Sequence, residues 1–317
     1  MAESDDPHAR LDALYPTAVE PNLAQLEQER GDTLKFSGLI AGAFVVIQVL
    51  FALAGWEMLL FTVPVFAIIA AQMFAMMLRR YGDEVRKVAL PAVIEAIGDI
   101  DHTKGQAAGD LGRFVDAQVL RSHGNHPEVS DVFSGIWRDV RFEMAEVVLR
   151  DVKTFGTSTQ KPTKQRHYFR GLLFTIATPT PISARILLRG KQRLVRAAPW
   201  RARVGDGLQR VQLPHAGFNR HLELWSDDPD MALSVVTPAF ADTMASLADS
   251  AGWYRLDAAF DEDLFLLALP RLSRRFAIGR PWQPLSQLRR ETRELLDEVR
   301  VVHRLIDVLL GDAGGRS

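Results

Sequence analysis

The chain is 317 residues long, with 47% hydrophobic residues, 24% charged residues and a formal net charge of -1. This near-neutral total argues against a dedicated nucleic-acid binder, because such proteins usually carry a strong basic excess. The chain contains no cysteine, which excludes disulfides, thiolate metal sites and cysteine nucleophiles.

The N-terminal stretch, residues 1–21, is acidic and contains prolines. It lacks a basic segment leading into a short apolar core, so it does not read as a secretory signal peptide. We expect residues 1–21 to form a flexible acidic tail.

Two long uncharged blocks follow, separated by one carboxylate. Between Lys35 and Glu57, and again between Glu57 and Arg79, lie 21 uncharged residues. As a helix, each block would be about 31 Å long, which matches a hydrocarbon core of about 30 Å. We therefore predict two membrane spans at about 36–55 and 58–78. The alternative, which we favour less, is a pair of helices buried in a large soluble core.

Glu57 sets the boundary between the two spans. A carboxylate at mid-membrane costs on the order of 3 kcal/mol, and far less at the interface. Gly55 supplies a helix break and Trp56 an interfacial aromatic ring. Residues 22–80 are therefore predicted to hold a juxtamembrane helix and a transmembrane hairpin.

Positive charge predicts how this hairpin is oriented. Lys35 precedes the first span, and Arg79, Arg80, Arg86 and Lys87 crowd the exit of the second. Positively charged flanks stay on the cytoplasmic side, so both termini are predicted to be cytoplasmic. Neither span carries an ionisable residue at mid-membrane, so the hairpin is interpreted as an anchor.

Small residues suggest how the two spans pack. Gly38 and Gly42 lie one turn apart on the first span, and Ala71 and Ala75 repeat this spacing on the second. Small residues that face each other allow close backbone approach, so we expect these four to form the hairpin contact. Chance is the alternative, because glycine and alanine are common in membrane helices.

Helical and strand patterns share the rest of the chain. Residues 81–122 are predicted as a helical linker region, interrupted at Pro91. Apolar runs rich in valine, phenylalanine and tryptophan then alternate as strands do, and two of them are expected to form a hairpin around Asp261–Asp263. We predict a cytosolic α+β domain over 123–310, with a largely antiparallel sheet and flanking helices, and a short tail over 311–317.

The domain is predicted to end in a long amphipathic helix over 284–310. Its apolar residues are spaced alternately by three and four, which is typical of a seam that could form a coiled coil with a partner helix. A helix lying on its own domain shows the same spacing, and we favour that reading. The seam consists of Leu285, Leu288, Thr292, Leu295, Val299, Val302, Ile306 and Leu309.

Two stretches, HYFRGLLFTI (167–176) and LSVVTPAFADTMASLA (233–248), resemble the signatures of the bacterial family called domain of unknown function 3137. The residues that carry the likeness are Phe169, Arg170, Gly171, Val236, Thr237, Pro238, Ala239 and Phe240. Together with the two-span anchor, the resemblance covers roughly Leu34 to Leu310. It implies a protein of the bacterial inner membrane whose role is unknown, and it supplies no reaction, cofactor or catalytic residue.

Two groups of residues were weighed as metal ligands. His123 and His126 lie three apart, and His215 and His221 share a later segment, but no thiolate or carboxylate pattern completes a zinc site. Asp261–Asp263 is a dense acidic cluster, although turn residues between strands are commonly acidic. We therefore predict no metal, no cofactor and no catalytic residue.

A basic segment is the remaining candidate site. From Arg185 to Arg210 the chain carries eight basic residues and one acid, Asp206. Such a segment can contact anionic lipid, at about 1 kcal/mol per basic residue, or it can be a charged edge that protects a strand. RNA is a weaker alternative because the total charge is not basic. The candidate lipid contacts are Arg189, Lys191, Arg193, Arg196, Trp200, Arg201 and Arg203.

These patterns predict a membrane-anchored, non-enzymatic module that binds a partner protein or the inner membrane surface. The expected partners are the lipid bilayer and a partner protein or a second copy, without nucleic acid or a small-molecule ligand. The alternative is an enzyme acting on an anionic or lipid-like substrate, with a site assembled from residues distant in sequence.

Overall fold

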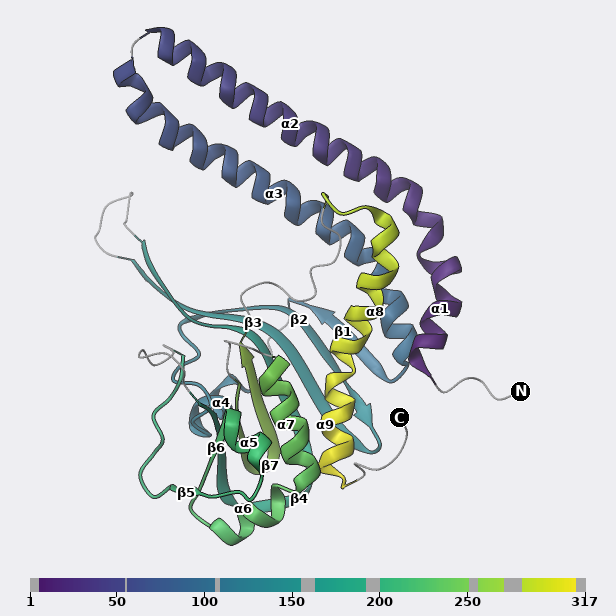
Figure 1. The fold of residues 1–317 in the computed structure, drawn as a ribbon, viewed down its shortest axis with the longest axis vertical. Coiled ribbons are helices and arrows are strands. Elements are labelled where there is room, and N and C mark those ends of the chain that lie inside the picture. The colour runs from purple at the N-terminus through teal and green to yellow at the C-terminus, as the bar shows by residue number, and fades with distance from the viewer. Residues whose placement is uncertain are drawn as a thin grey trace. The chain divides into compact units, whose positions relative to one another are not determined.

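The computed structural model describes residues 6–54, 56–105, 109–154, 163–191, 200–250, 256–270 and 281–311 (Figure 1). Its backbone contacts divide the chain into two compact units. The helical unit comprises residues 1–98 and 275–299, and the sheet unit comprises residues 99–274 and 300–317.

Two long helices dominate the helical unit. α2 (Leu23–Ala54) and α3 (Trp56–Ile97) run antiparallel to each other in Figure 1. Both are long and apolar enough to cross a membrane. Their apolar side chains point outward, and Leu39, Leu53 and Met76 are 66%, 81% and 65% exposed. The predicted pair of long apolar helices is confirmed.

The helices meet where the sequence predicts the hairpin tip. α2 ends and α3 begins on either side of Gly55, which lies outside the described residues, as do the side chains of Trp56 and Glu57. The aromatic rings of Phe51 and Phe66 pack across the pair, with centroids 6.2 Å apart.

A base bundle forms below the apolar part of the hairpin. It consists of α1 (Pro7–Ala18), the last four turns of α3, and α8 (Leu288–Val299), which pack against one another. Asp12 of α1 accepts hydrogen bonds from Arg293 at 2.5 Å and Arg289 at 3.2 Å. These guanidinium groups, Arg293 foremost, lower the pKa of the Asp12 carboxyl. Short 3-10 turns lead into α2 and α8, at Glu20–Asn22 and Leu285–Gln287.

Two expectations for this region are wrong. Residues 7–18 form a helix and not a flexible tail, because Asp6 caps it and Leu11 and Tyr15 are buried in the base bundle. α3 continues through Pro91 without interruption. Pro91 is exposed, whereas Ala89 and Val93 on either side are fully buried, so packing offsets the lost backbone hydrogen bond.

The sheet unit contains a seven-stranded sheet, counted over the described residues, in which all neighbouring strands are antiparallel. Its order is β1-β2-β3-β4-β6-β5, with β7 along the other side of β4. The strands are β1 (Ile100–Lys104), β2 (His126–Trp137), β3 (Val140–Thr154), β4 (Thr163–Gly190), β5 (Gln209–Val211), β6 (Leu222–Ser226) and β7 (Asp257–Pro270). With its flanking helices, the unit confirms the predicted α+β class with an antiparallel sheet.

Two long strands, β4 and β7, form a ribbon that bends in the middle. Pairing between them is interrupted from Ala177 to Ile182, a stretch that includes Pro179 and Pro181. Proline has no N–H to donate to the ladder, which explains the gap. Opposite the gap, Glu262 has a positive φ of 53°.

The hairpin expected around Asp261–Asp263 is therefore wrong. Its two halves are one strand, and both pair with β4: Ala259 lies opposite Leu187, and Leu266 lies opposite Thr175. The alternating pattern indicated strands correctly, but it contained no information about which strand each half would pair with.

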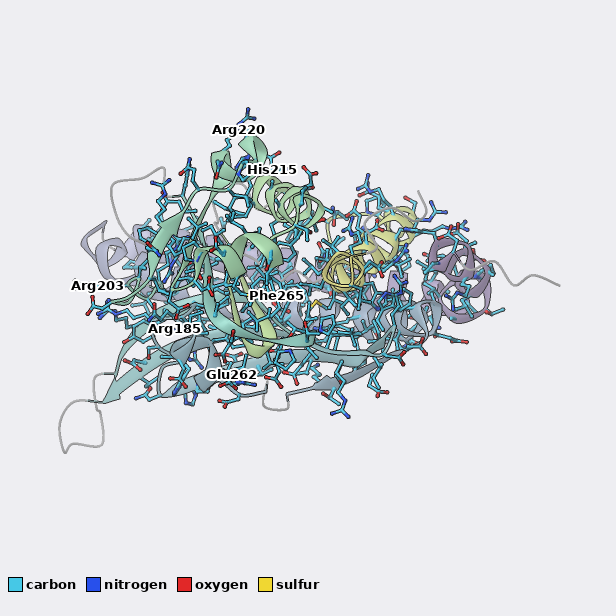
Figure 2. The ribbon with its side chains drawn as sticks, turned by 90° about the horizontal axis from the view of Figure 1, so that it is seen from below. Arg185, Arg203, His215, Arg220, Glu262 and Phe265 are labelled. Atoms are coloured by element: carbon cyan, nitrogen blue, oxygen red, sulfur yellow. The ribbon has the colours of Figure 1, made fainter. Side chains whose placement is uncertain are left out.

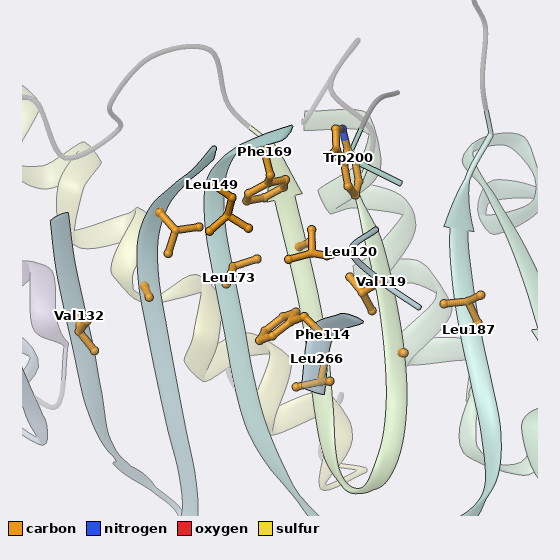
Figure 3. Close-up of a cluster of buried hydrophobic side chains, with 14 residues drawn as sticks. Phe114, Val119, Leu120, Val132, Leu149, Phe169, Leu173, Leu187, Trp200 and Leu266 are labelled. Atoms are coloured by element: carbon orange, nitrogen blue, oxygen red, sulfur yellow. The ribbon is translucent and has the colours of Figure 1, made fainter. Parts of the chain in front are cut away.

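Both faces of the sheet are covered. On one face, side chains from β2, β3, β4 and β7 converge with Phe114 of α4 (Leu111–Asp116) and with Leu120 and Trp200 (Figure 3). On the other, α7 (Pro238–Ser250) places Phe240 against Phe260 and Phe265, and α9 (Val301–Leu309) packs on β3 and β4. The remaining helices are α5 (Ala216–His221) and α6 (Pro229–Val235).

The long terminal helix is divided at Arg300. Its first part, α8, buries Leu288, Thr292, Leu295 and Val299 within the helical unit, and its second part, α9, buries its apolar side chains within the sheet unit. The seam thus packs on its own chain, as we favoured. No glycine or proline lies near Arg300 in the sequence to indicate this break.

Candidate functional site

One charged group in the sheet unit is a buried cluster centred on Asp257. This residue begins β7 and is 0% exposed. Its Oδ2 accepts a hydrogen bond from Nη1 of Arg189 at 2.7 Å, and its Oδ1 accepts one from Arg201. The backbone N–H of Gly190 donates to Oδ1 at 3.0 Å. We call Arg189, Arg201 and Asp257 the buried arginine cluster.

This cluster brings two positive charges and one negative charge into the interior. The side chains of Arg189 and Arg201 are only 7% and 9% exposed. Burial raises the pKa of the Asp257 carboxyl, whereas the guanidinium groups of Arg201 and Arg189 favour its ionised form. Charges this deeply buried are stable only when they remain paired, so the cluster depends on Asp257.

Gln118 makes two hydrogen bonds beside the buried arginine cluster. It adopts a positive φ of 62°, and its backbone carbonyl accepts a hydrogen bond from Nη2 of Arg189 at 2.7 Å. Its side-chain Oε1 accepts the N–H of Gly205 at 2.8 Å. A Cβ on Gly205 would lie 2.2 Å from Nε2 of Gln118, so a larger residue there would displace this side chain from its hydrogen bond.

The cluster overturns part of the predicted lipid contact. Arg189 and Arg201 bind Asp257, and Trp200 is 8% exposed and packs edge-to-face on Phe169 at 5.4 Å. None of these three side chains can reach a lipid headgroup, so the prediction is wrong for them. Interior packing holds Trp200, and the buried carboxylate of Asp257 holds Arg189 and Arg201, whereas the sequence predicts all three at the surface.

The remaining candidates in the basic segment have different positions. Lys191 donates to the backbone carbonyl of Asn219. Arg203 is exposed and points outward, as does Arg220 (Figure 2). Arg193 and Arg196 lie outside the described residues.

The acidic bend of β7 is a binding site for an arginine of the same chain. Arg113 of α4 lies 3.2 Å from the carboxylate of Asp261, 3.8 Å from that of Glu262 and 3.3 Å from that of Asp263. One guanidinium therefore holds three carboxylates where the ribbon turns. These acids stabilise the bend by pairing with Arg113.

The histidines considered as metal ligands make separate contacts. His123 Nδ1 lies 2.6 Å from the carbonyl of Gly124. His215 Nδ1 accepts the N–H of Phe218, which fixes its proton on Nε2, and Nε2 faces Asp242 at 3.0 Å. Across the described ranges, no three histidine, aspartate or glutamate side chains are grouped so that they could hold a metal ion.

The motif residues have structural contacts in the sheet unit. Phe169 is 2% exposed and packs on Trp200. A Cβ on Gly171 would lie 2.2 Å from the carbonyl oxygen of Leu269, because β7 pairs with β4 at this position. Thr237 Oγ1 accepts the N–H of Phe240 at 3.2 Å and caps α7, which begins at Pro238.

The small residues of the hairpin do not meet. A Cβ added to Gly38 or Gly42 would find no atom within 4 Å, and Ala71 is exposed. Ala75 is half-buried. The predicted packing through Gly38 and Gly42 is therefore wrong, because both positions face open space.

Sequence reasoning missed Asp257, Gln118 and Arg113. Asp257 had one usable signal, since it is a charge at the start of the apolar strand DAAF. Such a residue is buried only if a partner reaches it, and its partners lie 56 and 68 positions away. Gln118 and Arg113 carry no pattern that separates them from ordinary surface residues.

Comparison with known proteins gives three results. No curated protein matches the chain. A crystal structure of the mycobacterial trehalose monomycolate transport factor A, TtfA, is 13% identical, with a TM-score of 0.36, and the match covers 68% of this chain and 95% of that one. The family described as "Protein of unknown function (DUF3137)" matches residues 167–310, as the two motifs predicted.

Proposed function

We propose that this chain is a membrane-anchored, non-enzymatic module of the bacterial inner membrane that holds its sheet unit on the cytoplasmic side, where the unit binds a partner protein. The observation that carries the proposal is the outward-facing apolar surface of α2 and α3. Leu53, for example, is 81% exposed. Such a surface is stable in lipid and not in water.

The charged pairs of the sheet unit, of which those of Asp257 are buried, support a binding role over a catalytic one. Arg189 and Arg201 are paired with Asp257, and Arg113 is paired with the acidic bend. His215 is paired with Asp242. Groups that could have performed chemistry thus hold the fold together, and the exposed surface is what the unit offers to other molecules.

Crosslinking in cells tests the partner. The full-length chain is tagged, crosslinked before the membranes are solubilised, and compared with the Asp257→Ala variant, whose sheet unit should lose its fold while the anchor remains. A partner of the sheet unit should crosslink to the first chain and be lost from the second.

Proteins captured equally by both chains would be neighbours of the anchor only. If every crosslink persisted in the Asp257→Ala variant, after loss of the fold had been verified by limited proteolysis, the sheet unit would not be a binding module.

A further inference from the structure

One exposed tryptophan in the helical unit has no role in the interior. Trp282 is 56% exposed and belongs to the turn that leads into α8. The preceding residue, Pro281, is buried, and its carbonyl accepts a hydrogen bond from Nη1 of Arg30 at 3.2 Å. Arg30 lies on α2, so this turn is fastened to the hairpin itself.

The position of Arg30 gives the depth of the turn. Arg30 precedes Phe36, the first residue of the uncharged block, by six positions, or about 9 Å of helix. On α3, Tyr81 follows Leu78 by three positions, or about 4.5 Å, and the charges of Arg30 and Glu291 both act on its side chain. The headgroup layer on each side of a bilayer is roughly 5–7 Å thick. Tyr81 therefore falls within this layer and Arg30 just outside it, so the turn lies at the boundary between the headgroups and water.

The residues around this level suit a phospholipid surface. Lys35 has a side chain that is 84% exposed, and its nearest acid, Asp32, is 3.9 Å away. Arg79 and Arg80 are exposed and form no ion pair with another residue in the described part of the chain. Tryptophan is enriched at this depth because its ring is apolar and its N–H is polar.

We infer that Trp282 inserts into the phospholipid headgroup layer of the leaflet that contains the base of the hairpin, as a third attachment point beside α2 and α3. This inference rests on the proposed membrane anchoring. We assign the bilayer as the binding partner of Trp282, because the turn lies next to the level at which the apolar residues of α2 and α3 end. The base bundle is then held against the membrane by α8 as well as by the two spans.

Site-directed spin labelling tests the inference in the full-length chain. Since the chain has no cysteine, Gln283→Cys provides a single nitroxide site that leaves Trp282 in place. The protein is reconstituted into vesicles of phosphatidylethanolamine and phosphatidylglycerol, and power saturation with oxygen and with a water-soluble nickel chelate reports depth. Leu39→Cys marks the hydrocarbon and Glu294→Cys marks water, because these residues are 66% exposed on α2 and 65% exposed on α8.

The label at position 283 should lie between the two references, at headgroup depth. If it matched Glu294→Cys while Leu39→Cys remained deep, the inference would be overturned and the anchoring would stand. If Leu39→Cys were itself reached by the nickel chelate, the anchoring would fail and the inference with it.

A second variant isolates the role of the ring. Adding Trp282→Ala to the labelled chain should shift the label at 283 toward the water reference. Leu233→Ala, which removes an exposed apolar side chain of the sheet unit, should leave its depth unchanged. A label that stayed at headgroup depth without the tryptophan would show that Trp282 is not an attachment point.

Discussion

Asp257 holds two arginines in the interior of the sheet unit, and each depends on it for charge compensation. Removing one partner of a buried ion pair typically costs about 3–5 kcal/mol, because the remaining charge is left without compensation. We expect Asp257→Ala to lower the free energy of unfolding by at least that amount, as measured by chemical denaturation in detergent.

Asp227 provides the matched control for this experiment. It also pairs with an arginine, Arg185, but the two side chains are 32% and 58% exposed. Exposed pairs contribute roughly 0–1 kcal/mol, so Asp227→Ala should have little effect. Equal effects from the two variants would contradict the central role given to the buried arginine cluster.

His303 of α9 makes the stability of the sheet unit depend on pH. Its ring is 5% exposed and stacks on Trp137 at 4.1 Å, and its Nε2 finds no hydrogen-bond partner among the described residues. Burial, reinforced by the charge of Arg300 and opposed by those of Asp307 and Asp99, lowers its pKa from 6.5 to about 4. The folded chain therefore keeps this imidazole neutral where the unfolded chain protonates it.

The contribution of His303 is present in full above pH 6.5 and is lost as the pH falls toward 4. Between pH 7 and pH 5 the loss should be roughly 2 kcal/mol. His303→Phe keeps an aromatic ring at this position but cannot titrate. Relative to this variant, the native chain should lose that amount of unfolding free energy between pH 7 and pH 5. Parallel pH curves for the two chains would contradict the assignment.

At the scale of elements, Gly171 lies opposite Pro270 where β4 pairs closely with β7. A Cβ there would lie 2.2 Å from a backbone carbonyl oxygen and 2.8 Å from the Cα of Pro270, so the strands would have to separate. We expect Gly171→Ala to destabilise the sheet unit by several kcal/mol, because the added methyl group overpacks a site that has no room for it. Gly38→Ala adds the same methyl group to α2 in open space and should not lower stability. Thermal unfolding of both variants distinguishes them.

The elements themselves were largely predictable from sequence, whereas their partners were not. The strands of β2, β3 and β6 and the Thr237 cap of α7 follow from alternation and cap chemistry, which are local signals. The bend of β7 onto a single partner depends on pairing between residues about 70 to 100 positions apart. Trp200 was misplaced for the same reason, because its burial depends on Phe169 and not on its basic neighbours.

For the whole molecule, the decisive measurement is topology. The charges that flank α2 and α3 favour a cytoplasmic position for both ends of the hairpin, which is the orientation we propose. Reporter enzymes fused after residues 30, 56 and 100 should be active as cytoplasmic, external and cytoplasmic markers, respectively. A fusion after residue 100 that is reached by a reagent unable to cross the membrane would reverse the proposed orientation.

The helical unit is built from two stretches of chain that are made at different times. α1 and α3 are made before the strands of the sheet unit, whereas α8, which packs against both, is made after them. Until then the hairpin stands in the membrane with an incomplete base and with the buried face of Leu11 and Tyr15 short of its cover. A chain that is cut before α8 therefore leaves this face partly uncovered, and the helical unit is complete only once α8 has been added.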